Sequence, residues 1–187
     1  MNIAVFGGRF DPPHVGHLQV AQGVLAAGLG IDQVWLLPAN THPWRPVTAS
    51  AQDRLAMVKL MQTDKIKASD IDVARGGETY TIDTVRILLQ DKTNRYFWVC
   101  GIDQLKDLYR WKEYEELNYL INFIVFPRKG FDEKTNLPPR FTLIRDNFIP
   151  NDISSSIIRE KIRKGESLTG FITDPVAAYI QSHHLYE

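Results

Sequence analysis

The sequence has little cysteine, no excess of charge and no long hydrophobic run. Its one cysteine, Cys100, lies in an apolar run, so an internal disulfide is excluded and a reduced, cytoplasmic protein is expected. Lys plus Arg equals Asp plus Glu at 22 each, so no net field attracts nucleic acid or an anionic membrane. No apolar run approaches the ~20 residues of a membrane helix, and no signal segment opens the chain. Any phosphate binding must therefore come from a local arrangement.

Short apolar runs alternate with helical patterns along the 187 residues. Alternation of this kind predicts an α/β fold, namely one doubly wound, mainly parallel sheet with right-handed crossovers, as a single domain over 1–187. Strands are expected over 3–6, 33–37, 66–73, 95–100, 121–126 and near 141–145. Helices are expected from Asp11 to Gly28 or Gly30, over 51–61, from about 81 to 89, shortly after 103, from the serines at 154–156 to Gly165, and after Pro175. In the helix over 51–61, the residues Ala51, Leu55, Val58 and Met61 form a stripe that faces the core. Loops are expected over 38–46 and 131–139.

The segment from Ile3 to His17 combines a buried strand, a pair of glycines and a helix opening at Asp11-Pro12-Pro13. His14 and His17 are three residues apart, so they share one face in the first turns of that helix. Unpaired backbone N–H groups and the helix dipole favour an anion there. Two other interpretations stay open, a metal pair that lacks a visible third ligand and ordinary buried histidines.

A second anion-binding pattern lies near the end of the sequence, where Ser154-Ser155-Ser156 opens a helix that carries Arg159. Serine hydroxyls, helix N–H groups and a planar guanidinium on one face suit a phosphate chain. An ordinary N-cap beside a solvated arginine is the alternative. Because parallel sheets bind ligands beyond the carboxyl ends of their strands, both patterns can share one cleft.

The segment Gly7-Gly8-Arg9-Phe10-Asp11-Pro12-Pro13-His14-Val15-Gly16-His17 resembles the signature of the HxGH nucleotidyltransferases. Bacterial nicotinate-nucleotide adenylyltransferases carry Gly-Gly-Thr/Ser-Phe-Asp-Pro-x-His-x-Gly-His there, so Arg9 departs from the pattern. Residues 153–159 resemble the second signature of that family, Ile-Ser-Ser-Thr/Ser-x-x-Arg. Residues 101–103 and 111–114 match its adenosine and nicotinate regions, and the likeness extends over almost the whole chain. Trp44 stands where relatives often have histidine.

This resemblance implies adenylyl transfer from ATP, with Mg²⁺, to nicotinate mononucleotide, giving deamido-NAD and pyrophosphate by in-line attack on the α-phosphate. No nucleic-acid or membrane partner is implied. His14, His17 and Arg159 are the candidate catalytic groups, because the reaction needs charge stabilisation more than a base. No metal ligand is expected from the protein. The candidate ATP-binding residues are Gly7, Gly8, Arg9, Phe10, Gly16, Gly101, Asp103, Ile153, Ser154, Ser155 and Ser156, and the candidate mononucleotide-binding residues are Asn40, Arg45, Tyr80, Thr81 and Trp111.

Three alternatives remain at this point. The acceptor could be nicotinamide mononucleotide or phosphopantetheine, or the chain could be a catalytically silent nucleotide-binding module. A fragment of an aminoacyl-tRNA synthetase is disfavoured, because the Lys-Met-Ser-Lys-Ser element is missing and the chain has no basic excess.

Overall fold

The computed structural model describes residues 1–44, 46–128, 137–144 and 152–187. Its centre is a six-stranded sheet in which every pairing is parallel, in the order β3-β2-β1-β4-β5-β6. The predicted doubly wound parallel sheet is confirmed. The strands are β1 (Asn2–Gly8), β2 (Gln33–Pro38), β3 (Ile66–Ala68), β4 (Arg95–Gly101), β5 (Asn122–Phe126) and β6 (Phe141–Leu143).

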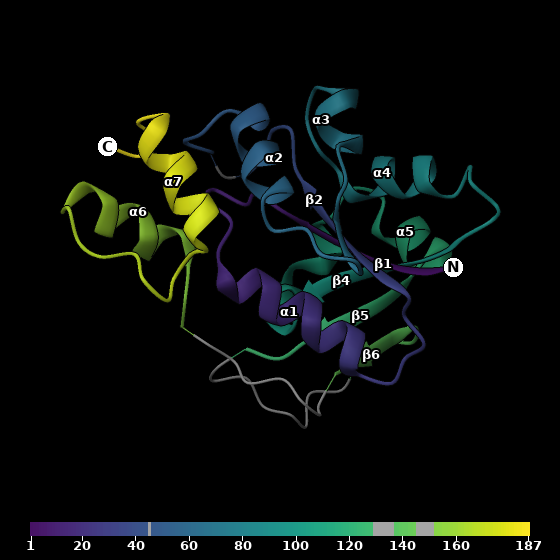
Figure 1. Ribbon diagram of the computed structural model, residues 1–187. Coiled ribbons are helices and arrows are strands. Elements are labelled where there is room, and N and C mark those ends of the chain that lie inside the picture. The colour runs from purple at the N-terminus through teal and green to yellow at the C-terminus, as the bar shows by residue number, and fades with distance from the viewer. Residues whose placement is uncertain (45, 129–136, 145–151) are drawn as a thin grey trace.

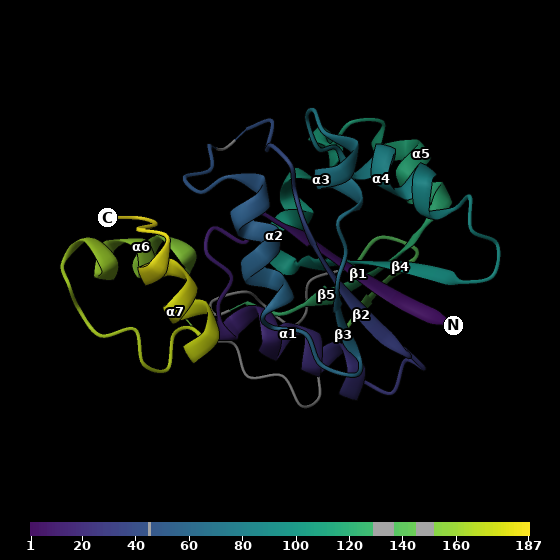
Figure 2. The same cartoon turned by 45° about the horizontal axis from the view of Figure 1, so that its top comes forward.

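Helices cover both faces of this sheet (Figure 1, Figure 2). Side chains of β1 alternate between the faces. Ile3 and Val5 pack in the cluster with α4 and α5, whereas Ala4 and Phe6 pack in the cluster with α1. All four are almost fully buried, as expected for a central parallel strand. The helices are α1 (Val15–Ala26), α2 (Ala51–Lys59), α3 (Ile71–Arg75), α4 (Thr81–Leu88), the 3₁₀ helix η1 (Ile102–Arg110), α5 (Tyr114–Leu120), α6 (Ser155–Arg163) and α7 (Asp174–Ser182).

The last two helices, α6 and α7, lie to one side of the sheet and pack on α2 (Figure 1). A third apolar cluster joins them, in which Met57 of α2 meets Ile158 of α6 and Val176 of α7. Residues from the last third of the chain are thereby brought to the loop that follows β1.

The strand order reverses between β1 and β4, which are neighbours although two strands intervene in the sequence. Gly8 ends β1 and Gly101 ends β4 at the same edge of the sheet. This is the position where open α/β sheets bind ligands.

Two predicted elements have clearly different limits in the structure. The first helix begins at Val15, not at Asp11-Pro12-Pro13, and ends at Ala26 before the two expected glycines. The strand expected over 66–73 ends at Ala68, because Asp72 pairs with Arg75 and Thr84 from within α3. Residues 131–136 of the predicted loop and Arg145 of the last predicted strand lie outside the described residues.

The buried face of α2 also differs from the predicted stripe, because it contains an arginine. Arg54 is fully buried, whereas Ala51 and Leu55 are only half-buried and Val58 and Met61 are buried as predicted. The Arg54 guanidinium donates to the carbonyl oxygens of Arg9 at 2.7 Å, Ala39 at 2.6 Å and Ala49 at 3.2 Å, and to that of Asn40 at 2.7 Å. One side chain thus fixes the segments after β1 and β2 and the start of α2.

We expect Arg54→Met to lower the free energy of unfolding by more than about 3 kcal/mol, because it leaves several buried carbonyl oxygens without a donor. Urea unfolding followed by circular dichroism measures the change. Arg163→Met, which removes an exposed arginine from the last turn of α6, is the matched control and should change the value by less than about 0.5 kcal/mol. Equal stability of the two variants would contradict this role of Arg54.

Candidate functional site

Residues 9–14, which we name the Asp11 loop, connect β1 to α1 and include a cis peptide bond between Asp11 and Pro12. The Asp11 carboxylate is 1% exposed and accepts the backbone N–H groups of Thr48 at 2.7 Å and Ala49 at 3.0 Å. Its Oδ1 also accepts the hydroxyl of Tyr186 at 2.9 Å. Asp11 therefore joins other parts of the chain, and it does not cap α1 as the sequence predicted.

Helix α6 binds the backbone of the same loop. Nη1 of Arg159 donates to the carbonyl oxygen of Asp11 at 2.6 Å, and Oγ of Ser155 donates to that of Pro12 at 2.8 Å. Nη2 of Arg159 also contacts Oγ of Ser156 at 3.3 Å, and Oγ of Ser154 caps the helix by accepting the N–H of Ile157. The two anion-binding patterns that the sequence predicted, 148 residues apart along the chain, lie side by side.

The two histidines are stacked at the start of α1, with ring centroids 3.7 Å apart. The backbone N–H of His14 donates to Nδ1 of His17 at 3.1 Å, and because this nitrogen accepts, the neutral His17 ring carries its proton on Nε2. Nδ1 of His14 is buried and has no hydrogen-bond partner among the described residues. The predicted pair on one face is therefore present, with one nitrogen position free of any described partner.

Both imidazoles are neutral near pH 7. Burial, followed by the nearby positive charge of Arg128, lowers the pKa of His14 from 6.5 to about 4. Burial also lowers the pKa of His17 well below 6.5, with added contributions from His14 and Arg128. A neutral imidazole keeps one N–H, so each ring can donate one hydrogen bond to an anion.

The amides at the start of α1 are less available than the sequence predicted. The N–H of Val15 donates to the carbonyl oxygen of Phe171 at 2.9 Å, and that of His17 donates to the carbonyl oxygen of His14 at 2.9 Å. Gly16, between them, is buried in the first turn. An anion at this site would therefore depend more on side chains and on the start of α6 than on the start of α1.

The glycine pair after β1 has a packing role in this structure. A Cβ at Gly7 would lie 2.6 Å from the ring of Trp98, and a Cβ at Gly8 would lie 3.2 Å from the ring of Phe10. Phe10 is itself buried, with a positive φ of 50°, and its ring lies 4.6 Å from that of His17. Phe10 thus packs against His17 from the core, and Gly7 leaves room for the ring of Trp98.

The end of β4 presents an ion pair that sequence reasoning missed. Oδ1 of Asp103 lies 3.4 Å from Nε of Arg128, which follows β5. A Cβ at Gly101 would lie 2.3 Å from that oxygen, so the carboxylate rests directly on the glycine. Nothing in the sequence singled out Arg128, yet its charge acts on both histidines.

Two ATP-site candidates remain, Arg9 in the Asp11 loop and Ile153 just before α6. Nη1 of Arg9 points to the carbonyl oxygen of Pro46 at 3.4 Å, across from that loop. Ile153 packs beside the third apolar cluster, next to the cap Ser154. Neither contact identifies a ligand for these two residues.

Among the candidate mononucleotide residues, Asn40 binds the segment that directly precedes Tyr80 and Thr81. The N–H of Asn40 donates to Oγ1 of Thr79 at 2.9 Å, and its side-chain amide donates to the carbonyl oxygen of Gly77 at 2.8 Å. Tyr80 is the N-cap residue of α4 and Thr81 its first residue. Trp111 is half-buried at the end of η1, Trp44 is 56% exposed, and Arg45 lies outside the described residues.

The described residues contain neither a metal-ligating cluster nor a membrane-spanning helix. No group of three or more His, Cys, Asp or Glu side chains in these ranges is placed to hold a metal ion. None of the helices there has the length and apolar character needed to cross a bilayer.

Comparison with known proteins gives consistent results. The model of the cytidylyltransferase-like family matches residues 5–161. A probable nicotinate-nucleotide adenylyltransferase of Shouchella clausii is 39% identical over 98% of this chain and 96% of its own, and one of Bordetella pertussis is 37% identical over 98% and 97%. The structure of Plasmodium falciparum nicotinic acid mononucleotide adenylyltransferase complexed with NaAD shares the fold, with a TM-score of 0.80 at 22% identity over 99% of this chain and 97% of that one.

We expect the stability of the protein to fall with pH below about 6.5 because of the buried histidines. Between pH 6.5 and 4 the unfolded chain binds a proton at His14 that the native state does not, so this group lowers the free energy of unfolding by about 3 kcal/mol at pH 4. Above pH 7 the imidazole is neutral in both states and contributes nothing. Urea unfolding of the wild type and of His14→Gln from pH 4 to 8 measures the difference, and the variant should show the flatter profile.

The control for this measurement is His184→Gln, which removes an exposed imidazole. It should leave the slope of the wild type unchanged. A His14→Gln profile as steep as that of the wild type would show that His14 is not buried in its neutral form.

Proposed function

Because the chain belongs to the cytidylyltransferase-like family, and within it to the nicotinate-nucleotide adenylyltransferases, we propose that it joins the adenylyl group of ATP to nicotinate mononucleotide. The products are deamido-NAD and pyrophosphate, a step of NAD biosynthesis. The whole chain, residues 1–187, acts as one nucleotidyltransferase domain in this proposal.

The observation that carries the proposal is the contact of α6 with the Asp11 loop. Arg159 and Ser155 bind the carbonyl oxygens of Asp11 and Pro12, which directly precede the histidine pair. A guanidinium, serine hydroxyls and two neutral imidazoles around one position suit a triphosphate, because they supply donors to many oxygens at once.

The reaction itself asks for little covalent help from the protein. The 5′-phosphate of the acceptor has a second pKa near ~6, so it attacks the α-phosphate as a largely ionised group without a general base. What the site must supply is alignment and stabilisation of the charge that develops on pyrophosphate. We assign that stabilisation to His14, His17 and Arg159.

The other site residues hold the two nucleotides in this proposal. Gly101 and Asp103 lie at the end of β4, where adenosine would displace Arg128 from the Asp103 carboxylate. Tyr80 and Thr81 present helix N–H groups to the acceptor, Trp111 a ring face, and Arg45 a charge for its phosphate. The residues proposed to bind the triphosphate end of ATP are Gly7, Gly8, Arg9, Phe10, Gly16, Ile153, Ser154, Ser155 and Ser156, and Asn40 completes the acceptor site.

Mg²⁺ enters this proposal as the partner of ATP. The described ranges contain no cluster of three metal-ligating side chains, so in this proposal phosphate oxygens and water supply most of the ligands of the ion. When bound, the ion neutralises charge on the phosphates.

We place the reaction in the cytoplasm. The single cysteine supports this location, because Cys100 is a buried free thiol and the chain does not rely on an internal disulfide.

The test of the proposed function is pyrophosphate release from ATP and Mg²⁺ with three separate acceptors. We expect release with nicotinate mononucleotide that stops when EDTA chelates the Mg²⁺ and returns when excess Mg²⁺ is added. Release with phosphopantetheine alone would show a different acceptor. No release with nicotinate mononucleotide, nicotinamide mononucleotide or phosphopantetheine would favour a catalytically silent module.

We expect His14→Ala to lower kcat by about 10²–10³-fold, because it removes a donor placed for the leaving pyrophosphate. The affinity for ATP, measured by calorimetry, should change much less. His184→Ala, which alters an exposed histidine outside the site, is the control for both measurements. Near-normal turnover by a folded His14→Ala protein would overturn the assignment.

A further inference from the structure

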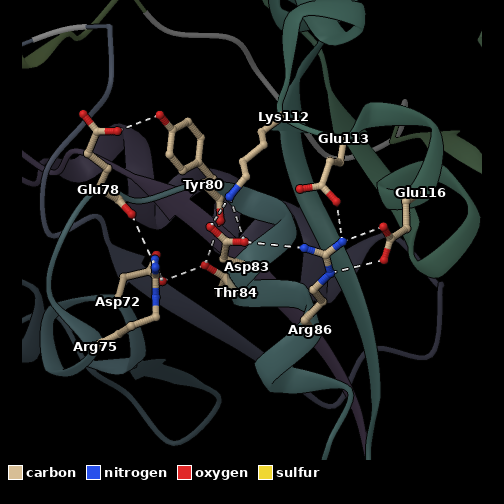
Figure 3. Close-up of polar contacts among 10 residues, drawn as sticks. All are labelled: Asp72, Arg75, Glu78, Tyr80, Asp83, Thr84, Arg86, Lys112, Glu113 and Glu116. Carbon is tan, nitrogen blue, oxygen red and sulfur yellow. Dashed lines mark hydrogen bonds and ion pairs between the residues drawn. The ribbon is translucent and has the colours of Figure 1, made fainter.

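A dense group of charged side chains surrounds the start of α4 (Figure 3). Asp83, in the first turn of the helix, lies 3.0 Å and 3.2 Å from Nζ of Lys112, which comes from the turn between η1 and α5. Nζ of Lys112 also lies 4.8 Å above the ring of Tyr80. This lysine therefore links the N-cap residue of α4 to the carboxylate beside it.

The other two cations of this group bind other carboxylates, although one of them also pairs with Asp83. Arg86 binds Glu113 and Glu116, and its Nη1 lies 3.7 Å from Oδ1 of Asp83, farther than Nζ of Lys112. Arg75 pairs with Asp72. Among the ten residues of Figure 3, five are acidic and three are basic, so the group has an excess of negative charge. Lys112 is the cation among them that contacts both Asp83 and Tyr80.

An excess of carboxylates repels an acidic ligand. A nicotinate carboxylate at the N–H groups of Tyr80 and Thr81 would lie within one helical turn of Asp83. Removing the charge of Lys112 would leave that aspartate only partly neutralised, and the two like charges would repel each other. A nicotinamide at the same place carries a neutral amide instead of the carboxylate, so it would not meet this repulsion, and the positive charge of the pyridinium nitrogen is common to both acceptors.

Resting on the function proposed above, we propose that Lys112 is a specificity-determining residue that favours an acidic pyridine acceptor over its amide. It acts by neutralising Asp83 at the start of α4. At the partly exposed positions of these groups, where the lysine side chain is 41% and the aspartate 24% exposed, the effect is about five- to tenfold in selectivity.

The experiment compares kcat/KM for nicotinate mononucleotide and nicotinamide mononucleotide in the wild type, Lys112→Met, Lys112→Arg and the double variant Lys112→Met with Asp83→Asn. We expect Lys112→Met to lower the ratio of acid to amide about five- to tenfold, through KM for the acid, with kcat within about twofold. Lys112→Arg should keep the ratio. The double variant should restore most of it, because the repelling carboxylate is gone.

The matched control is Lys92→Met, which removes an exposed lysine beyond the opposite end of α4. It should leave the ratio unchanged. An unchanged ratio in Lys112→Met, or an equal loss for both acceptors, would overturn the inference, since an equal loss is what a purely structural role produces. If the wild type used neither acceptor, the proposed function would fail as well, so the two failures are distinguishable.

Discussion

The hydrogen bonds of Asp11 are the constraint on which the arrangement of this molecule depends. Its buried carboxylate holds the segment before α2 and the hydroxyl of Tyr186, while its carbonyl oxygen holds Arg159. A buried carboxylate is stable only when its oxygens are occupied, so these segments are fixed relative to one another. Arg54 completes the arrangement from α2 by binding carbonyl oxygens on the same segments. The sheet provides the frame, and these two side chains shape the end of it where the candidate site lies.

Most of the fold follows from local patterns. The apolar runs at β1, β2, β4 and β5 are long enough to be recognised, and the triple serine correctly placed the start of α6. The predicted start of α1 was wrong, because Asp11 is a residue type that commonly caps helices but here bonds to residues distant in sequence. The predicted end of β3 was wrong. The β-branched residues after Ala68 favour a strand, whereas the buried Asp72 lies in α3 and accepts a hydrogen bond from Thr84 there.

The candidate site was predictable where residues close in sequence act together, as His14 and His17 do, and where a resemblance could connect them to Arg159. Arg54 and Arg128 were not recognised, because a lone arginine in a helical pattern or a turn normally lies in solvent. Only the tertiary structure shows that one is fully buried and that the other lies against Asp103. The glycine pair shows the opposite case. The sequence singled out both residues for ligand binding, whereas Gly7 is glycine in the structure because a Cβ there would collide with the ring of Trp98.

The bond from Tyr186 to Asp11 has a consequence for the order in which the protein is made. Asp11 leaves the ribosome 148 residues before Arg159 and 175 residues before Tyr186. Until those residues are synthesised, a growing chain can build the strands but lacks the groups that fix the loop beside the histidines. Translation therefore supplies the contacts around the candidate site last, so a polypeptide that stops before α6 lacks the side chains that hold the Asp11 loop.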